Sequence, residues 1–281
     1  MDTLVSTDWL ARELGATDLV VLDASRHLPA AGRDPGAEFL DGHIPGARFL
    51  DLGRLTDPAS PVGATLPGSI QASVVLGALG LEREQRIVIY DDSAVKTSAR
   101  AWFILAGYGF EHIAILDGGI AKWRAEGRPI ASGKADLEPR LLPPTEFQGN
   151  VRRKQQMLAN LATRTEQVID ARDAGRFTGE TIDTVHNLPG GHIPGARNVF
   201  FAELYNPDGT LRPNDELRSA FEAAGVDLAA PIVTSCGSGV TACALLFALD
   251  RLGKRDTALY DGSWSEWGAD PATPKETGLA A

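Results

Sequence analysis

The chain has 281 residues, of which 43% are hydrophobic and 23% are charged, as in folded globular domains and unlike disordered segments. Its formal net charge of -10 disfavours nucleic acid and anionic membranes as main partners, because both repel such a surface. No apolar run is long enough to span a membrane, and the first residues lack a signal-peptide pattern. We therefore expect a cytoplasmic protein, with a length that favours two domains.

The first half of the chain contains short apolar runs that are typical of buried strands, with a helix-like pattern between two of them. The predicted strands are Leu19–Leu22, Ile87–Tyr90 and Ile113–Leu116, and the predicted helix is Thr97–Gly107. The following segment, Lys134–Asn150, is rich in proline, which favours extended chain and predicts a linker.

The second half repeats this alternation. Its predicted strands are Gln167–Ile169, Pro231–Thr234 and Ala258–Tyr260, and its predicted helix is Val240–Leu252. Strands that alternate with helices predict an α/β fold with a mostly parallel sheet flanked by helices, and ligands bind such sheets beyond the carboxyl ends of the strands. The residues from Ala269 to the end are predicted to be weakly ordered.

An internal duplication is the clearest organisational signal. The six residues His43–Arg48 recur unchanged as His192–Arg197, and Val21–Ala24 resembles Val168–Ala171. Because these matches keep their order and spacing, they indicate two copies of one domain. We predict domains over residues 1–133 and 151–281, joined by a linker over residues 134–150.

A small-residue loop follows the predicted strand Pro231–Thr234 and begins with a cysteine. Glycines let its amides turn inward, and the next helix adds the positive end of its dipole, so the loop favours an anion. We therefore interpret Cys236 as a nucleophile that reacts as a thiolate, the alternative being a small buried hydrophobic residue. The loop reads Cys236-Gly237-Ser238-Gly239-Val240-Thr241.

The remaining cysteine chemistry is limited. Cys243 lies on the apolar face of the predicted helix, which indicates core packing, and its distance from Cys236 along that helix disfavours a disulfide. With no other cysteine and few histidines, we predict neither a metal site nor a cofactor.

The loop Cys236–Thr241 resembles that of the 3-mercaptopyruvate sulfurtransferases of the tandem-domain rhodanese superfamily. The duplicated His-Ile-Pro-Gly-Ala segments and the segment Asp261–Trp267 are also similar to motifs of that family, so the resemblance covers essentially the whole chain. It implies two rhodanese-like domains and a cysteine that takes sulfur from a small-molecule donor as a persulfide. The persulfide sulfur then passes to cyanide or to a thiol acceptor such as thioredoxin or glutathione.

The resemblance also implies that only the second copy is catalytic. When the two copies are aligned, Asp91 stands at the place of Cys236, and a carboxylate cannot accept sulfane sulfur. We therefore interpret the first copy as an inactive scaffold.

Neutral residues after the nucleophile favour 3-mercaptopyruvate as donor. Thiosulfate enzymes of the family carry basic residues at the positions of Gly237 and Ser238. Arg176 matches the family's substrate-binding arginine, whose guanidinium can hold the donor carboxylate. The predicted site thus combines Cys236 with Arg176 and the loop residues Gly237, Ser238, Gly239, Val240 and Thr241; thiosulfate remains the alternative donor.

Three positions depart from the family pattern. The second carboxylate-binding arginine is replaced by Val185, so Arg176 acts alone or His186 substitutes for the missing residue. The Asp and His of a proposed relay with the loop serine are replaced by Gly53 and Ala64, so the resemblance does not supply that relay here.

Two other functions compete with sulfur transfer. Phosphatases related by fold need an arginine six residues after the cysteine, and Ala242 stands there. A non-catalytic persulfide carrier or sensor is the second alternative. His43 and His192 stand at matching positions of the two copies, which indicates a structural role. We interpret the strand-end carboxylates Asp23 and Asp170 as structural too. Asp170 also suits a position from which it would support a residue of the active site.

Overall fold

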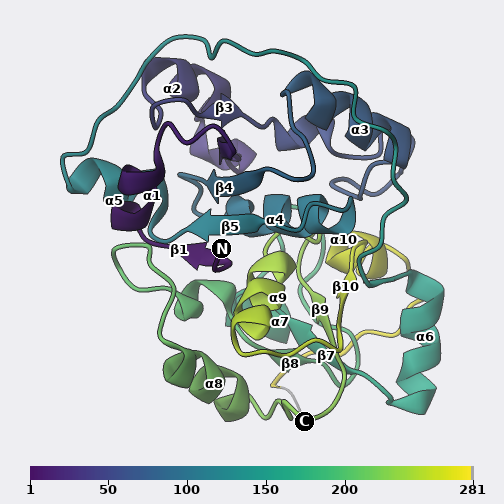
Figure 1. Cartoon of the computed structure of the whole chain (residues 1–281). Coiled ribbons are helices and arrows are strands. Elements are labelled where there is room, and N and C mark those ends of the chain that lie inside the picture. Colours follow the sequence, from purple (N-terminus) through teal and green to yellow (C-terminus); the bar gives the residue numbers. More distant parts are fainter. Residues whose placement is uncertain (280–281) are drawn as a thin grey trace. The chain divides into compact units, whose positions relative to one another are not determined.

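The computed structural model describes residues 1–279, which divide into two compact units (Figure 1). Unit 1 comprises Met1–Thr56, Leu66–Gly149 and Asn206–Leu211. Unit 2 comprises Asp57–Thr65, Asn150–Tyr205 and the chain from Arg212 onward. Each unit is built around a five-stranded sheet in which every pairing is parallel.

Unit 1 has the strand order β1-β5-β4-β2-β3, with helices on both faces of the sheet. Its strands are β1 (Leu4–Val5), β2 (Leu19–Asp23), β3 (Arg48–Phe49), β4 (Arg86–Tyr90) and β5 (Ile113–Leu116). Its helices are α1 (Thr7–Glu13), α2 (Pro35–Asp41), α3 (Ser69–Ala78), α4 (Thr97–Gly107) and α5 (Gly119–Ala125), with 3₁₀ turns at Pro29–Ala31 and Leu52–Arg54.

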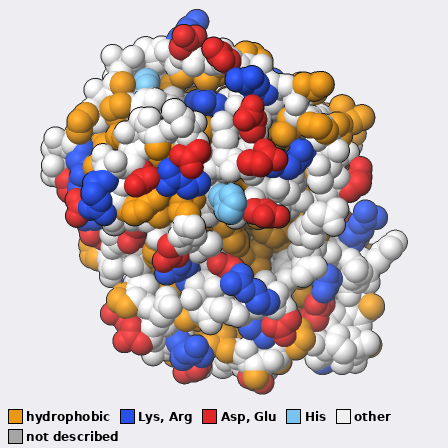
Figure 2. Space-filling view, in the orientation of Figure 1, with side chains coloured by type: hydrophobic (Ala, Val, Ile, Leu, Met, Phe, Trp, Pro, Cys, Tyr) orange, Lys and Arg blue, Asp and Glu red, His pale blue; other side chains and the backbone are white. Residues whose placement is uncertain are grey.

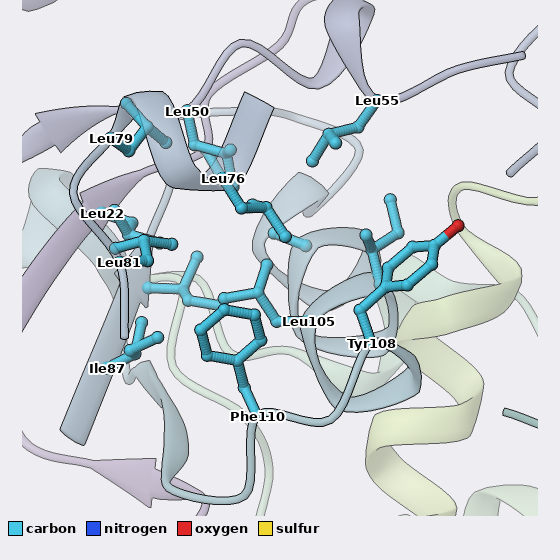
Figure 3. Close-up of a cluster of buried hydrophobic side chains, with 14 of the residues drawn as sticks. Leu22, Leu50, Leu55, Leu76, Leu79, Leu81, Ile87, Leu105, Tyr108 and Phe110 are labelled. Atoms are coloured by element: carbon cyan, nitrogen blue, oxygen red, sulfur yellow. The ribbon is translucent and has the colours of Figure 1, made fainter. Parts of the chain in front are cut away.

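Successive side chains of the unit 1 strands point to opposite faces and enter two separate cores. Leu22 and Ile87 join the cluster under α3 and α4, which Figure 3 shows with Leu76, Leu105 and Phe110. The alternate strand residues, such as Val88, pack on the other face with residues of α1, α2 and α5. Because both faces are covered, the strands are continuously apolar rather than alternating.

Unit 2 repeats the architecture with the order β6-β10-β9-β7-β8. Its strands are β6 (Val151–Arg152), β7 (Gln167–Asp170), β8 (Arg197–Asn198), β9 (Ile232–Ser235) and β10 (Thr257–Tyr260). Its helices are α6 (Lys154–Thr163), α7 (Ala174–Thr178), α8 (Asn214–Ala223), α9 (Ala242–Arg251) and α10 (Ser263–Trp267), with a 3₁₀ turn at Phe201–Leu204.

The duplicated histidines are structural in both units. His43 is buried, stacks on Phe39 at 4.1 Å and bonds through Nδ1 to that residue's carbonyl oxygen at 2.7 Å. His192 does the same with Phe177, at 3.9 Å and 2.9 Å. Each imidazole therefore ties its segment to the preceding helix, as its occurrence in both copies indicates.

The predicted strands and helices agree with the structure to within one or two residues. The helix predicted from Val240 begins at Ala242, because the glycine-containing loop extends further than its apolar spacing suggested. The four two-residue strands β1, β3, β6 and β8 were not predicted, since so short an element shows no periodicity.

The prediction of a weakly ordered C-terminal segment is wrong for residues 269–279; residues 280–281 lie outside the described part. Trp267 donates through Nε1 to the carbonyl oxygen of Pro274 at 2.8 Å, and Thr273 is buried. Glu276 pairs with His192 through two backbone hydrogen bonds of 2.8 and 3.0 Å. The segment is therefore held by tertiary contacts that its polar composition does not reveal.

The predicted linker contains neither helix nor strand, yet much of it packs on unit 1. Arg140 donates its amide to Gly77, and Gln148 donates to Gly107, both at 2.8 Å. The ring of Phe147 lies 5.1 Å from that of Tyr108. These contacts hold the segment along its own unit up to Gly149.

Surface charges of both signs are interspersed over the face seen in Figure 2, without an extended basic patch. Within residues 1–279, no helix combines the length and the apolar character needed to cross a membrane.

Candidate active site

Cys236 follows β9 directly and is 2% exposed. Its amide donates to the Ser263 hydroxyl at 3.0 Å, and the same hydroxyl oxygen lies 4.0 Å from Sγ. That hydroxyl also donates to the carbonyl oxygen of Tyr260 at 2.8 Å. Ser263 thus connects the start of the loop to the carboxyl end of β10.

Two further residues of α10, the helix that begins at Ser263, fix the loop. Trp264 donates its amide to the carbonyl oxygen of Cys236 at 2.9 Å. Ser265 donates both its amide and its hydroxyl to the carbonyl oxygen of Gly237, at 2.8 and 2.7 Å. With these carbonyl groups satisfied by α10, the thiol-bearing residue is held in one backbone arrangement.

The rest of the loop leads into α9 as a turn of small residues. The amides of Ser238 and Val240 donate to no protein acceptor among the described residues. Gly239 has a φ of 76°, a conformation that residues with a Cβ rarely adopt. Thr241 caps α9, and Cys243 is fully buried, its Sγ donating to the carbonyl oxygen of Gly239 at 3.2 Å. Such a turn before a helix favours an anion.

The predicted substrate-binding arginine lies on α7. The Arg176 side chain is 21% exposed and donates through Nε to the Asp173 carboxylate at 2.5 Å. Its Nη1 lies 3.6 Å from Oδ1 of Asp183. The guanidinium is therefore oriented by two carboxylates and remains partly accessible.

A second arginine, which sequence reasoning missed, lies buried beside the loop. Arg172 follows β7, is 1% exposed, and donates through Nη2 to Asp170 at 2.6 Å and to the carbonyl oxygen of Gly191 at 2.7 Å. Its guanidinium carbon lies 4.5 Å from the centre of the Trp264 ring. Within residues 1–279, Nη1 has no hydrogen-bond partner, and it lies 4.0 Å from Oδ2 of Asp183.

The electrostatic surroundings of Arg172 include the nucleophile. Burial by itself lowers the pKa of Arg172, but Asp170, Asp183 and the Cys236 thiolate together raise it. A comparison of the two copies contained the signal, because Asp23-Ala24 is followed by Ser25 whereas Asp170-Ala171 is followed by Arg172. Asp170, which the sequence placed in a supporting role, pairs with this arginine.

Val185 and His186 lie in the loop after α7. Val185 is exposed and places no charge at its position. His186 bonds through Nδ1 to Oδ2 of the fully buried Asp183 at 2.9 Å. Its ring lies over Gly237, where a Cβ would come within 2.1 Å of Cε1. Of the two residues, the structure brings only His186 to the nucleophile's loop.

In unit 1, the aligned position carries a carboxylate that binds its own loop. Asp91 accepts the amide of Ser93 at 2.8 Å and the amide of Ser98, in α4, at 2.7 Å. Gly53 donates its amide to Asp51 at 2.8 Å, and Ala64 has a φ of 64°. Neither Gly53 nor Ala64 has a side chain able to move a proton.

The sequence matches the model of the rhodanese-like domain twice, over residues 6–126 and 154–270. The chain belongs to the rhodanese family. Within the family, it is 38% identical to 3-mercaptopyruvate sulfurtransferase of Mus musculus over 270 residues, which cover 94% of this chain and 91% of the relative. The enzyme of that name from Escherichia coli K12 is 37% identical, with 97% of each chain covered. Thiosulfate sulfurtransferase of Bos taurus is 36% identical, with 94% and 91% covered.

Solved structures agree with this assignment. SseA from Escherichia coli, described among the 3-mercaptopyruvate sulfotransferases, superposes with a TM-score of 0.84 at 34% identity, covering 94% of this chain and 99% of SseA. Tum1 of Saccharomyces cerevisiae has the same fold, with a TM-score of 0.89 at 24% identity, over 98% and 99% of the two chains. The two rhodanese-like domains predicted from the sequence are confirmed.

Proposed function

We propose that this chain is a sulfurtransferase that moves sulfane sulfur from 3-mercaptopyruvate to a thiol acceptor or cyanide through a persulfide on Cys236. The observation that supports this best is the setting of Cys236. The thiol-bearing residue is buried at the end of β9, held by α10, and lies within the electrostatic reach of the buried Arg172. A full-length identity near 37% to enzymes of this name agrees with it.

The reaction proceeds in two displacements at sulfur. The Cys236 thiolate attacks the donor sulfur, an S–S bond forms, and the donor C–S bond breaks. The electron pair leaves on carbon as the enolate of pyruvate, which takes up a proton. The acceptor thiolate then attacks the outer sulfur of the persulfide, and Cys236 departs as a thiolate. Arg172, being buried and positively charged, stabilises the anionic sulfur at each stage.

The donor is argued from the first loop positions and from Arg176. Gly237 and Ser238 contribute no charge, so the loop itself does not hold a dianion. One partly exposed guanidinium, that of Arg176, suits a single carboxylate. Thiosulfate is the alternative donor, favoured by the similarity to bovine thiosulfate sulfurtransferase. We expect kcat/KM to be higher for 3-mercaptopyruvate than for thiosulfate, and a clear thiosulfate preference would refute the argument.

Turnover decides between an enzyme and a persulfide carrier. With 3-mercaptopyruvate and thioredoxin, glutathione or a dithiol, we expect pyruvate in many-fold excess over protein, and none from Cys236→Ser. Sulfide follows when a second thiol, of the same acceptor or of another glutathione molecule, attacks the acceptor persulfide and forms a disulfide. Mass spectrometry after donor alone should show one added sulfur on the wild-type chain. One equivalent of pyruvate without further turnover, for every small donor and acceptor, would instead indicate a carrier or sensor.

Phosphatase activity is not expected, because Ala242 at the start of α9 offers no guanidinium for a phosphate. Hydrolysis of an aryl phosphate that is lost in Cys236→Ser would contradict this. Thioredoxin or glutathione as the acceptor and the cytoplasmic location remain predictions from the sequence.

A further inference from the structure

His186 lies against the nucleophile's loop and is fixed there by a buried carboxylate. Its Nδ1 bonds to Asp183 at 2.9 Å, and Asp183 also accepts the amides of Val185 and His186 at 3.2 Å. The side chain of His186 is 17% exposed, whereas that of Asp183 is fully buried. The ring covers Gly237, the residue next to Cys236. Nε2 is the ring nitrogen that Asp183 does not engage.

Asp183 is shared between the imidazole and two guanidiniums. Its oxygens lie 3.6 Å from Nη1 of Arg176 and 4.0 Å from Nη1 of Arg172. Burial tends to raise the pKa of Asp183, but the hydrogen bond and charge of His186 and the charge of Arg176 outweigh it and lower that pKa. Asp183 is therefore ionised at neutral pH, and it accepts a hydrogen bond from Nδ1 of His186.

The balance of charge around the loop depends on the imidazole. Besides His186, the cluster holds three carboxylates and two guanidiniums. Its members are Asp170, Asp173, Asp183, Arg172 and Arg176. Glu266 of α10 is engaged by the Tyr260 hydroxyl at 2.8 Å. When the imidazole is neutral, the net charge of the cluster is -1, and the Cys236 thiolate adds a second negative charge. When the imidazole is protonated, the net charge of the cluster is zero.

We propose that His186 is a donor-binding residue, whose imidazolium, held by Asp183 over Gly237, lowers the negative charge of the site and attracts the carboxylate of the donor together with Arg176. The proposal rests on the proposed function for the identity of the donor. Histidine is the side chain that changes charge between about pH 5 and 8, so donor capture becomes dependent on pH in that range. A rise in pH removes the positive charge, and KM for the anionic donor increases.

Two substitutions distinguish the effect of a positive charge at position 186 from the effect of losing that charge as pH rises. In His186→Asn the side-chain amide can still donate to Asp183 but carries no charge, and in His186→Lys the charge persists across the range. We expect KM of His186→Asn for 3-mercaptopyruvate to exceed the wild-type value about tenfold near pH 6 and to approach it near pH 8.5. We expect KM of His186→Lys to stay below the wild-type value near pH 8.5, with kcat changed less than about threefold in both.

We compare KM of each variant with the wild-type KM at the same pH. Any effect of pH on the donor, the acceptor or Cys236 is the same in both proteins and cancels in this ratio. His27→Gln is the matched control, because His27 forms the same kind of pair with Glu38, at 2.9 Å, in unit 1. Its KM ratio should stay at one. A ratio for His186→Asn that does not change with pH, or a pH effect confined to kcat, overturns the proposal.

The proposed function can fail independently. If the wild-type protein does not turn over 3-mercaptopyruvate, the proposed function is wrong. The role of His186 in attracting a carboxylate can then still be tested by measuring binding. Calorimetry with pyruvate on Cys236→Ser, with and without His186→Asn, needs no turnover. The expected result is tighter binding at low pH that disappears in the double variant; equal affinities at every pH refute the role of His186.

Discussion

The loops after β4 and β9 begin from the same plan of strand, turn and helix, but their backbone amides are satisfied to different extents. In unit 1 the carboxylate of Asp91 accepts two amides of its own turn and helix, those of Ser93 and Ser98. In unit 2 the amides of Ser238 and Val240 have no acceptor among the described residues. The first loop therefore satisfies itself, whereas the second keeps donors for a substrate or a persulfide.

The neighbouring strand ends differ in the same sense. Asp23 accepts the amide of Ser25 at 2.9 Å, and the Ser25 hydroxyl accepts the amide of Asp92 at 2.9 Å. Asp170 instead pairs with the guanidinium of Arg172. Duplication thus kept the fold in both units, but the strand end of unit 2 carries Arg172 where unit 1 carries Ser25. Fold and chemistry are separable properties of these domains.

The largest expected effect is on turnover, when the cysteine is removed from the unit 2 loop and placed in the unit 1 loop. Cys236→Ser should lower 3-mercaptopyruvate turnover by about 10³-fold or more, because no other thiol takes its place. Asp91→Cys added to that variant should not restore activity, since Ser25 stands in unit 1 at the position from which Arg172 acts in unit 2. Sulfide release and mass spectrometry for added sulfur measure both. Recovery of turnover in the double variant would show that the two loops are chemically equivalent.

The next effect is on stability. Arg172→Met leaves the buried carboxylate of Asp170 without its counter-charge, and we expect unit 2 to lose about 3 kcal/mol. Ser25→Ala, at the matching position of unit 1, removes the hydroxyl that accepts the amide of Asp92 and should cost about 1 kcal/mol. Hydrogen exchange of the amides of β9 and β4 reports each unit separately. Equal losses in the two units would contradict the structural role given to Arg172.

A smaller effect is expected on donor binding. Arg176→Gln should raise KM for 3-mercaptopyruvate about tenfold and change kcat less, because a charge-assisted bond to the carboxylate is lost. Arg33→Gln is the control: in unit 1, Arg33 is paired with both Glu38 and Asp92. Steady-state kinetics should show no change for this control. An unchanged KM in Arg176→Gln would remove Arg176 from the site.

The smallest effect is the opposite response of the two units to acid. Burial raises the pKa of Asp23 and nearby Asp91 raises it further, whereas His186 and Arg176 lower that of Asp183 against its burial. Stability from Asp183 is present above its unfolded pKa, near 3.8, and is lost as pH falls through its lower folded pKa. Asp23 has the opposite effect on stability, because its pKa is higher in the folded protein than in the unfolded chain. Its contribution to stability is therefore lost as pH rises.

Urea unfolding followed by hydrogen exchange between about pH 3 and 6 measures the sign of the pH dependence in each unit. Asp183→Asn should flatten the acid dependence of unit 2, and Asp23→Asn should remove the opposite dependence of unit 1. Identical pH profiles for the two wild-type units would show that these carboxylates do not differ in the way described.

Local features of the sequence determined the elements and the duplication. The apolar runs that became β4, β5 and β9 are continuous because both faces of a parallel sheet are buried, and such runs are visible without a structure. The loop Cys236–Thr241 was found in the same way, since its glycines, its cysteine and the following helix are adjacent in the chain.

Only the tertiary structure decided which charges surround that loop. Arg172 follows β7, whereas Asp183 and His186 share a turn in the loop after α7. The two segments meet beside the loop after β9, a relation that sequence spacing does not specify. The ordering of residues 269–279 was hidden for the same reason. Contacts such as Glu276 with His192 connect segments far apart in the chain, so no local pattern predicts them.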